Sequence, residues 1–121
     1  MNIVIIGLGL IGGSIAKSLS VIDKVKIKAF DMNKDSINNA LENGSIHGAI
    51  HSLEELKNKE FNNSIIIIAT PPSAVVNVLK SISFLFNSSV TITDTTSTKS
   101  LLDKCLKEFD FPNNVIFSHP V

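Results

Sequence analysis

The stretch Ile3-Val4-Ile5-Ile6-Gly7-Leu8-Gly9-Leu10-Ile11-Gly12-Gly13-Ser14 decides the fold of this chain. A run of apolar, mostly β-branched residues leads directly into glycines spaced Gly-x-Gly-x-x-Gly. This pattern predicts a buried strand, a tight turn and then a helix. Gly7 permits the sharp turn, Gly9 lets a diphosphate approach the backbone with no Cβ in the way, and Gly12 lets the helix pack closely on the strand.

The start of the predicted helix is expected to bind an anion. The backbone N–H groups of Leu10, Ile11 and Gly12 have no carbonyl partner inside the helix, and the helix dipole adds positive potential there. These three residues, together with Gly7 and Gly9, are therefore candidate contacts for a dinucleotide.

Asp31 completes the fingerprint of a dinucleotide site. It follows residues 25–30, which alternate as a second strand does. A carboxylate at this place accepts hydrogen bonds from both adenosine ribose hydroxyls and repels a 2′-phosphate, so it favours NAD over NADP. Two alternatives stay open, because Asp31 could be a turn or N-cap acid and Lys34 could attract that phosphate.

Composition limits the class of protein. The chain has 121 residues, which is one domain's worth, and its 11 basic residues, all lysines, balance 11 acidic ones. Nothing therefore indicates a nucleic acid or a membrane as partner. A polycarboxylate substrate would need arginines from elsewhere. The single cysteine, Cys105, excludes an intrachain disulfide, no apolar run is long enough to span a bilayer, and we expect a cytoplasmic protein.

Strand and helix patterns alternate along the remainder of the chain. Helices are predicted over 11–19 (apolar at 11, 15, 16 and 19), 35–43 (Ile37, Ala40 and Leu41 inward), about 73–86 and about 99–109, and further strands near 46–50, at 64–69, 90–93 and 115–117, with a helical turn at 53–56. This alternation predicts a single α/β domain, a Rossmann-type doubly wound parallel sheet with strand order 3-2-1-4-5-6.

Polar residues and prolines follow the later strands. Thr70, Pro71 and Pro72 end the isoleucine-rich strand, and in a doubly wound sheet the carboxyl ends of the strands face the cofactor crevice. Thr70 and Pro71 should therefore lie beside the dinucleotide, and Pro72 suits the first turn of a helix. Ser97 and His119 follow the next strands; alternatively, Ser97 caps a helix and His119 has no chemical role. His47 and His51 lack a third ligand, so no metal site is predicted.

The chain resembles the nucleotide-binding half of the prephenate/arogenate dehydrogenase family. The motifs that carry the resemblance are GLGLIGGS at 7–14, Asp31, ATPP at 69–72, TDTTSTK at 93–99 and SHP at 118–120. They follow the family's order over nearly the whole chain. The loop with Ser97, followed by His119-Pro120, is the most specific of them.

The resemblance implies an NAD-dependent oxidative decarboxylation of prephenate to 4-hydroxyphenylpyruvate, or of arogenate, in tyrosine biosynthesis. His119 would accept the proton of the ring hydroxyl, and Ser97 would position the substrate near the nicotinamide. The family generally has a glycine where Thr96 stands, and it continues past the position of Val121 into a helical domain that supplies substrate-binding arginines and the dimer interface. We therefore expect this chain alone to be inactive, and a homodimer only for the full-length enzyme.

Two other classes of function stay open. One is a related oxidoreductase of the 3-hydroxyacid or pyrroline-carboxylate type, which shares the glycine turn but not the pairing of Ser97 with His119. The other is a non-catalytic module that binds NAD.

Overall fold

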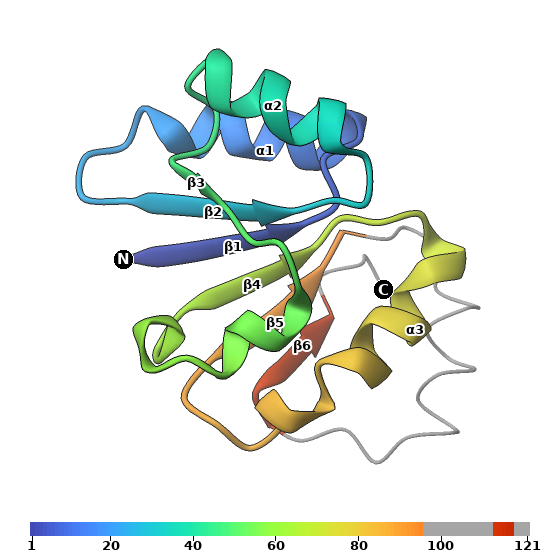
Figure 1. Cartoon of the computed structure of the whole chain (residues 1–121). Helices are drawn as coiled ribbons and strands as arrows, with labels where there is room; N and C mark the ends of the chain where they lie inside the picture. The colour runs from blue at the N-terminus through green and yellow to red at the C-terminus, as the bar shows by residue number, and fades with distance from the viewer. Residues whose placement is uncertain (96–112, 118–121) are drawn as a thin grey trace.

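A six-stranded parallel sheet with strand order β3-β2-β1-β4-β5-β6 forms the centre of the molecule (Figure 1). The computed structural model describes residues 1–95 and 113–117. The strands are β1 (Asn2–Ile6), β2 (Lys26–Phe30), β3 (Gly48–Ala49), β4 (Ile65–Ile68), β5 (Thr91–Asp94) and β6 (Val115–Phe117), and the helices are α1 (Leu10–Ser20), α2 (Lys34–Glu42) and α3 (Pro72–Ser81). The predicted α/β class and strand order are confirmed.

Side chains of β1 alternate between two hydrophobic cores, one on each face of the sheet. Ile3 and Ile5 belong to a cluster with Ala16 of α1 and Ala40 of α2. Val4 and Ile6 face the opposite side. Because β1 is buried on both faces, every residue from 3 to 6 has to be apolar, which explains the uninterrupted apolar run.

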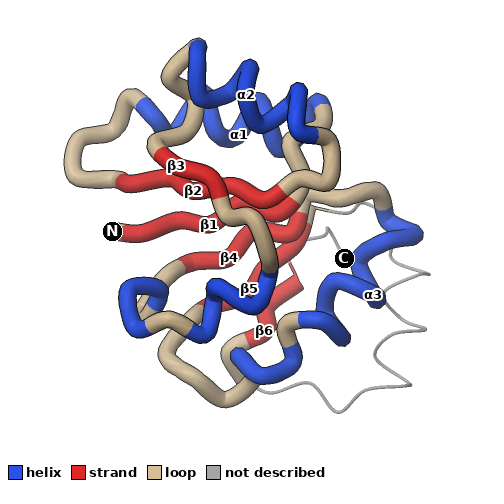
Figure 2. Tube along the Cα trace, viewed as in Figure 1, coloured by secondary structure: helices blue, strands red, loops and turns tan. Residues whose placement is uncertain are grey.

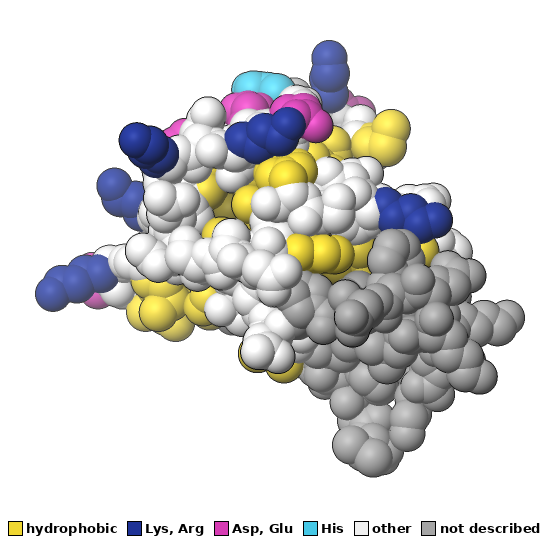
Figure 3. Space-filling model, turned by 90° about the horizontal axis from the view of Figure 1, so that it is seen from below, with side chains coloured by type: hydrophobic (Ala, Val, Ile, Leu, Met, Phe, Trp, Pro, Cys, Tyr) yellow, Lys and Arg dark blue, Asp and Glu magenta, His cyan; other side chains and the backbone are white. Residues whose placement is uncertain are grey.

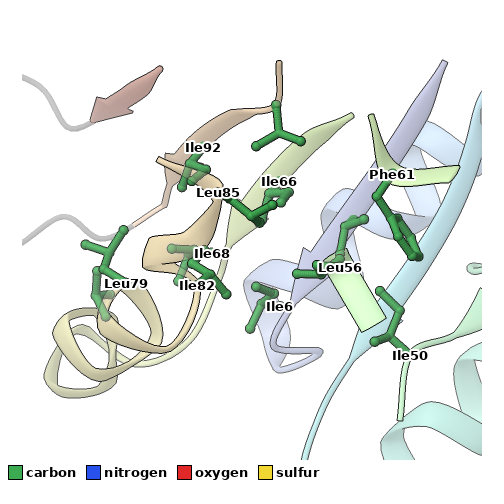
Figure 4. Packing of buried hydrophobic residues seen from close by; sticks show 13 residues of the cluster. Ile6, Ile50, Leu56, Phe61, Ile66, Ile68, Leu79, Ile82, Leu85 and Ile92 are labelled. Atoms are coloured by element: carbon green, nitrogen blue, oxygen red, sulfur yellow. The ribbon is translucent and has the colours of Figure 1, made fainter. Parts of the chain in front are cut away.

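The second cluster fills the face opposite α1 and α2 (Figures 2 and 4). It joins residues of β1, β4 and β5 to α3 and to short 3₁₀ helices at Leu53–Lys57, Lys59–Phe61 and Ser83–Leu85. The labelled members in Figure 4 are Ile6, Ile50, Leu56, Phe61, Ile66, Ile68, Leu79, Ile82, Leu85 and Ile92. This cluster holds α3 against the sheet, which sets one wall of the cleft described below.

The predicted helix over residues 73–86 is wrong in its length. Helix α3 ends at Ser81, and a 3₁₀ helix at Ser83–Leu85 follows it. Ile82 and Leu85 are nonetheless buried, because a 3₁₀ turn also returns side chains to the same face after three residues. Apolar spacing alone therefore could not distinguish the two kinds of helix.

Two residues expected to face inward are exposed. Ile11 is 56% exposed and Leu41 is 40% exposed. In α1 the residues that are buried are Gly12 and Ala16, because the helix lies so close to the sheet that only small side chains fit beneath it. Ile11 lies beside that contact stripe and borders a cleft instead.

His47 serves the sheet rather than a metal ion. Its Nδ1 accepts a hydrogen bond of 3.0 Å from the N–H of Ile27, a fully buried residue of β2. Its own N–H donates to the Ile27 carbonyl oxygen at 2.8 Å. The imidazole thus replaces a backbone acceptor where β3 has not yet begun. Within the part of the chain that the structure describes, no three His, Cys, Asp or Glu side chains are grouped to hold a metal.

We expect His47→Ala to destabilise the chain by about 1–3 kcal/mol, since the buried N–H of Ile27 loses its acceptor. Urea unfolding followed by circular dichroism measures this loss. His51→Ala is the matched control, because the contact of His51 with Glu55 is made by the backbone N–H and survives the substitution. Equal stability of the two variants would contradict the assigned role of His47.

Candidate nucleotide-binding site

The glycine turn is fixed between β2 and β4 at the carboxyl end of β1. The N–H of Gly7 donates to the Phe30 carbonyl oxygen at 2.8 Å, and the N–H of Ala69 donates to the Ile6 carbonyl oxygen at 2.8 Å. Gly7 has a φ of +101°, and a Cβ there would lie 3.0 Å from the backbone of Ala69 and Thr70. Only glycine tolerates both this φ and this close approach, so the sharp turn requires a glycine at position 7.

Gly12 and Gly9 are required for different reasons. A Cβ on Gly12 would lie 1.9 Å from the carbonyl oxygen of Gly7, so α1 crosses the turn in direct backbone contact. A Cβ on Gly9 would meet no atom of the described residues within 4 Å. The space beside Gly12 is thus filled by the backbone of the turn, whereas the space beside Gly9 is open to a ligand.

Among the described residues, none accepts a hydrogen bond from the first N–H groups of α1. Its N-cap, Gly9, has no side chain to accept a bond, and the N–H of Gly13 donates to the Gly9 carbonyl oxygen at 2.8 Å. The N–H groups of Leu10, Ile11 and Gly12 precede that first helical bond. Together with the helix dipole, they make this end of α1 a suitable binding place for a diphosphate.

Asp31 lies immediately after β2 and binds two backbone N–H groups. Its Oδ2 accepts from Leu8 of the glycine turn at 2.7 Å, and its Oδ1 accepts from Asn33 at 2.8 Å. Asn33 is in turn the N-cap of α2, with Oδ1 accepting from the N–H of Asp35 and of Ser36. The carboxylate is therefore held in one orientation, with its remaining lone pairs available for ribose hydroxyls.

A cleft of about 860 Å³ brings most of the predicted cofactor residues together. The predicted residues that line it are Gly7, Gly9, Leu10, Ile11, Asp31, Thr70, Pro71 and Pro72. Gly12 does not line it, because it lies against the Gly7 carbonyl. The size of the cleft suits a ligand larger than a single nucleotide base.

The cleft is also lined by residues that the sequence analysis missed. They are apolar or uncharged side chains: Phe30, Met32, Leu53, Ala74, Asn77, Val78, Ser81 and Thr95 among them. Met32 could have been found from its place beside Asp31. The α3 residues could not, because their spacing also fits ordinary core packing.

Leu53, which lines the cleft, is the first residue of a capped 3₁₀ helix. The Glu55 carboxylate accepts from the N–H of His51 at 2.6 Å and of Ser52 at 2.9 Å, and these bonds lower the pKa of Glu55. The Ser52 side chain completes a capping box. These bonds fix the segment before Leu53.

Thr70 brings a buried hydroxyl to the cleft. Its Oγ1 is shielded from solvent and has no hydrogen-bond partner among the described residues. Thr95, at the end of β5, directs its Oγ1 to the Ile68 carbonyl oxygen at 3.4 Å. The two predicted catalytic residues, Ser97 and His119, and the predicted helix over 99–109 lie outside the described residues.

Lysine side chains are scattered over the face shown in Figure 3, with acidic side chains among some of them. This spread agrees with the balanced formal charge of the sequence. No helix among the described residues is long and apolar enough to cross a membrane.

We expect Gly9→Ala to weaken dinucleotide binding at least tenfold without loss of stability. The new methyl group enters open space in the cleft, where the diphosphate would lie, and Gly9 has a φ of −68° that alanine adopts without strain. Calorimetric titration with NAD, beside thermal unfolding of the same sample, separates the two effects. Unchanged affinity for NAD would contradict the placement of the diphosphate.

The parallel sheet, the glycine turn at the end of β1 and the carboxylate at the end of β2 define a nucleotide-binding domain of the Rossmann type. A family model described as "Prephenate dehydrogenase, nucleotide-binding domain" matches residues 15–121. The chain belongs to this family, as the sequence motifs indicated.

Solved structures agree with this assignment. Prephenate dehydrogenase from A. aeolicus, in complex with hydroxyphenyl propionate and NAD+, is 28% identical with a TM-score of 0.80; the match covers 100% of this chain and 42% of that one. Arogenate dehydrogenase from Synechocystis shares the fold at 23% identity and a TM-score of 0.79, over 99% of this chain and 41% of that one. The present chain thus spans less than half the length of these relatives.

Proposed function

We propose that this chain is the NAD-binding domain of a prephenate dehydrogenase, which converts prephenate to 4-hydroxyphenylpyruvate. The single observation that carries the proposal is the Asp31 carboxylate, fixed by Leu8 beside an open helix N-terminus in one cleft. Family membership supplies the class of reaction. Bound NAD would supply the acceptor for the hydride.

The described residues divide the work of binding NAD. The N–H groups of Leu10 and Ile11 would receive the diphosphate, since both residues border the cleft and the Gly9 cap offers no competing acceptor. Asp31 would accept the adenosine ribose hydroxyls and repel a 2′-phosphate. Thr70 would border the ligand, since it also lines the cleft.

A residue of the segment Ser118-His119-Pro120 would transfer the proton. A neutral imidazole at His119 suits a general base, because the ordinary pKa of histidine is about 6.5 and lies near working pH. Ser97 would hold the substrate hydroxyl beside it. A substrate with two carboxylates also needs cationic groups, and this arginine-free chain leaves them to a second, helical domain of the whole protein.

The same proposal covers the assembly. We place the dimer interface in that second domain and the enzyme in the cytoplasm. The alternative substrate is arogenate, which differs from prephenate in carrying an amino group on its side chain.

Two experiments, one after the other, test the proposal: calorimetry measures the affinity for NAD, and a turnover assay measures the activity of the whole protein. We expect the 121-residue chain to bind NAD at least tenfold more tightly than NADP, because of charge repulsion at Asp31. The whole protein should then oxidise prephenate or arogenate, and the better of the two identifies the substrate. Preference for NADP would contradict the role of Asp31. Binding of NAD without turnover of either substrate would contradict the proposed activity, and a panel of 3-hydroxyacid and pyrroline-carboxylate substrates would then distinguish a related oxidoreductase from a non-catalytic module.

A further inference from the structure

Both carboxylate oxygens of Asp31 accept hydrogen bonds from backbone N–H groups. One oxygen accepts from Leu8, which lies in the middle of the glycine turn, and the other accepts from Asn33 at the start of α2. Both bonds orient the carboxylate, and the bond to Leu8 also restrains the glycine turn itself. The 2.7 Å distance to Leu8 is that of a strong, charge-assisted hydrogen bond.

The bond to Leu8 restrains a turn that is flanked by glycines. Glycines at positions 7 and 9 flank Leu8, and glycine has the greatest conformational freedom of any residue. The tethers that hold the turn on its β2 side are the Gly7 bond to Phe30 and the Leu8 bond to Asp31. The free N–H groups of α1 begin at Leu10, just after this tether, so their direction depends on it.

Simple electrostatics predicts that the Asp31 carboxylate weakens the binding of an anion. The carboxylate borders the same cleft as the N-terminus of α1, and a negative charge repels a diphosphate. Removing it should therefore strengthen the binding of a diphosphate if charge alone mattered. If Asp31 instead positions the turn, removing it should weaken that binding, so the sign of the change decides.

We propose that Asp31 is a positioning residue for the diphosphate, acting through the N–H of Leu8, in addition to reading the ribose. The inference rests on the proposed function, since it places the diphosphate at the N-terminus of α1. It means that a substitution designed to admit NADP at position 31 also loosens the diphosphate site.

A ligand without ribose hydroxyls separates the two roles. ADP and 2′,3′-dideoxy-ADP carry the same adenine and diphosphate, but only ADP can donate hydroxyl hydrogen bonds to Asp31. We expect Asp31→Ala to bind dideoxy-ADP about tenfold more weakly than the unmodified chain, a loss of about 1.4 kcal/mol, and to lose more affinity still for ADP. Dideoxy-ADP binding that is unchanged or tighter in Asp31→Ala would overturn the proposal.

Asp35→Ala is the matched control for charge. Asp35 is an exposed acid in the first turn of α2, and its substitution removes one negative charge without removing the acceptor of Leu8. We expect its affinity for dideoxy-ADP to stay within twofold of the unmodified chain. An equal loss in both variants would overturn the proposal, because the loss would then not depend on the bond between Asp31 and Leu8.

Amide hydrogen exchange supplies a second readout that does not depend on one variant. Asp31→Asn keeps one carbonyl oxygen and can retain the bond to Leu8. Across the unmodified chain, Asp31→Asn and Asp31→Ala, protection of the Leu8 amide should follow affinity for dideoxy-ADP, while the Ala69 amide, bonded to Ile6, reports intact folding. If Asp31→Ala does not fold, the comparison with Asp31→Asn stands alone. A variant that loses Leu8 protection but keeps its affinity would overturn the proposal.

These outcomes are distinct from failure of the proposed function. If the unmodified chain binds neither NAD nor ADP, the proposed function is wrong. If it binds both, and only the response of dideoxy-ADP to Asp31→Ala is absent, the positioning role alone is wrong.

Discussion

Gly12→Ala is expected to cost about 3 kcal/mol or more of folding stability, the upper end for overpacking a rigid core. The new Cβ would lie 1.9 Å from the Gly7 carbonyl oxygen and 3.2 Å from the Cβ of Ala69. Gly7 cannot retreat, because its N–H is bonded to Phe30 and its own φ is positive. Urea unfolding monitored by far-ultraviolet circular dichroism measures the loss.

Gly13→Ala is the control in the same helix. A Cβ there would have only the Leu8 carbonyl oxygen nearby, at an ordinary 3.7 Å. Replacing glycine by alanine inside a helix is worth up to about 1 kcal/mol in helix propensity, so this variant should be as stable as the unmodified chain or more so. If both substitutions cost the same, the close crossing of α1 over the turn is wrong.

His119→Asn in the whole protein is expected to lower kcat about 10²–10⁴-fold, the usual contribution of a general base. Asparagine can still form a hydrogen bond to the substrate hydroxyl but cannot take its proton. Binding of NAD to this variant should be unchanged, because His119 is not among the residues proposed to bind the cofactor. Steady-state turnover with NAD and prephenate measures the effect.

The pH profile identifies the cause of that loss. With His119 as the base, kcat/KM should rise with pH as an imidazole loses its proton, and this rise should vanish in His119→Asn. His51→Asn is the matched control, since His51 is an exposed histidine away from the cleft lining. A His119→Asn enzyme with full turnover would show that the base is another group.

The fold was predictable because local patterns and global packing agree in this sequence. Residues 3–6 and 65–68 are apolar at every position, which only a sheet covered on both faces requires, and the glycine spacing then fixes where α1 begins. Helix length was less predictable. Burial of Ile82 and Leu85 is compatible with an α-helix or a 3₁₀ helix, and the choice depends on contacts with the sheet that sequence does not show.

Only half of the cleft could be predicted, for a physical reason. The glycine turn and Asp31 belong to one local motif, in which sequence distance determines spatial distance. The other lining residues, with Leu53 and Val78 among them, come from segments that meet only after the sheet forms. The bond from Leu8 to Asp31 was also missed, since the sequence analysis considered only a ligand or a local turn or cap as partner of the Asp31 carboxylate.

The shortness of β3 has a consequence for solubility. This outer strand contributes only Gly48 and Ala49 to the ladder, and the side chain of Lys28 lies 3.4 Å from where a Cβ of Gly48 would stand. Long outer strands are templates on which a second polypeptide adds by edge-to-edge pairing, the first step toward fibrils. Because β3 offers so few free backbone hydrogen-bonding groups, and the side chain of Lys28 lies beside them, a second polypeptide has little to pair with at this edge.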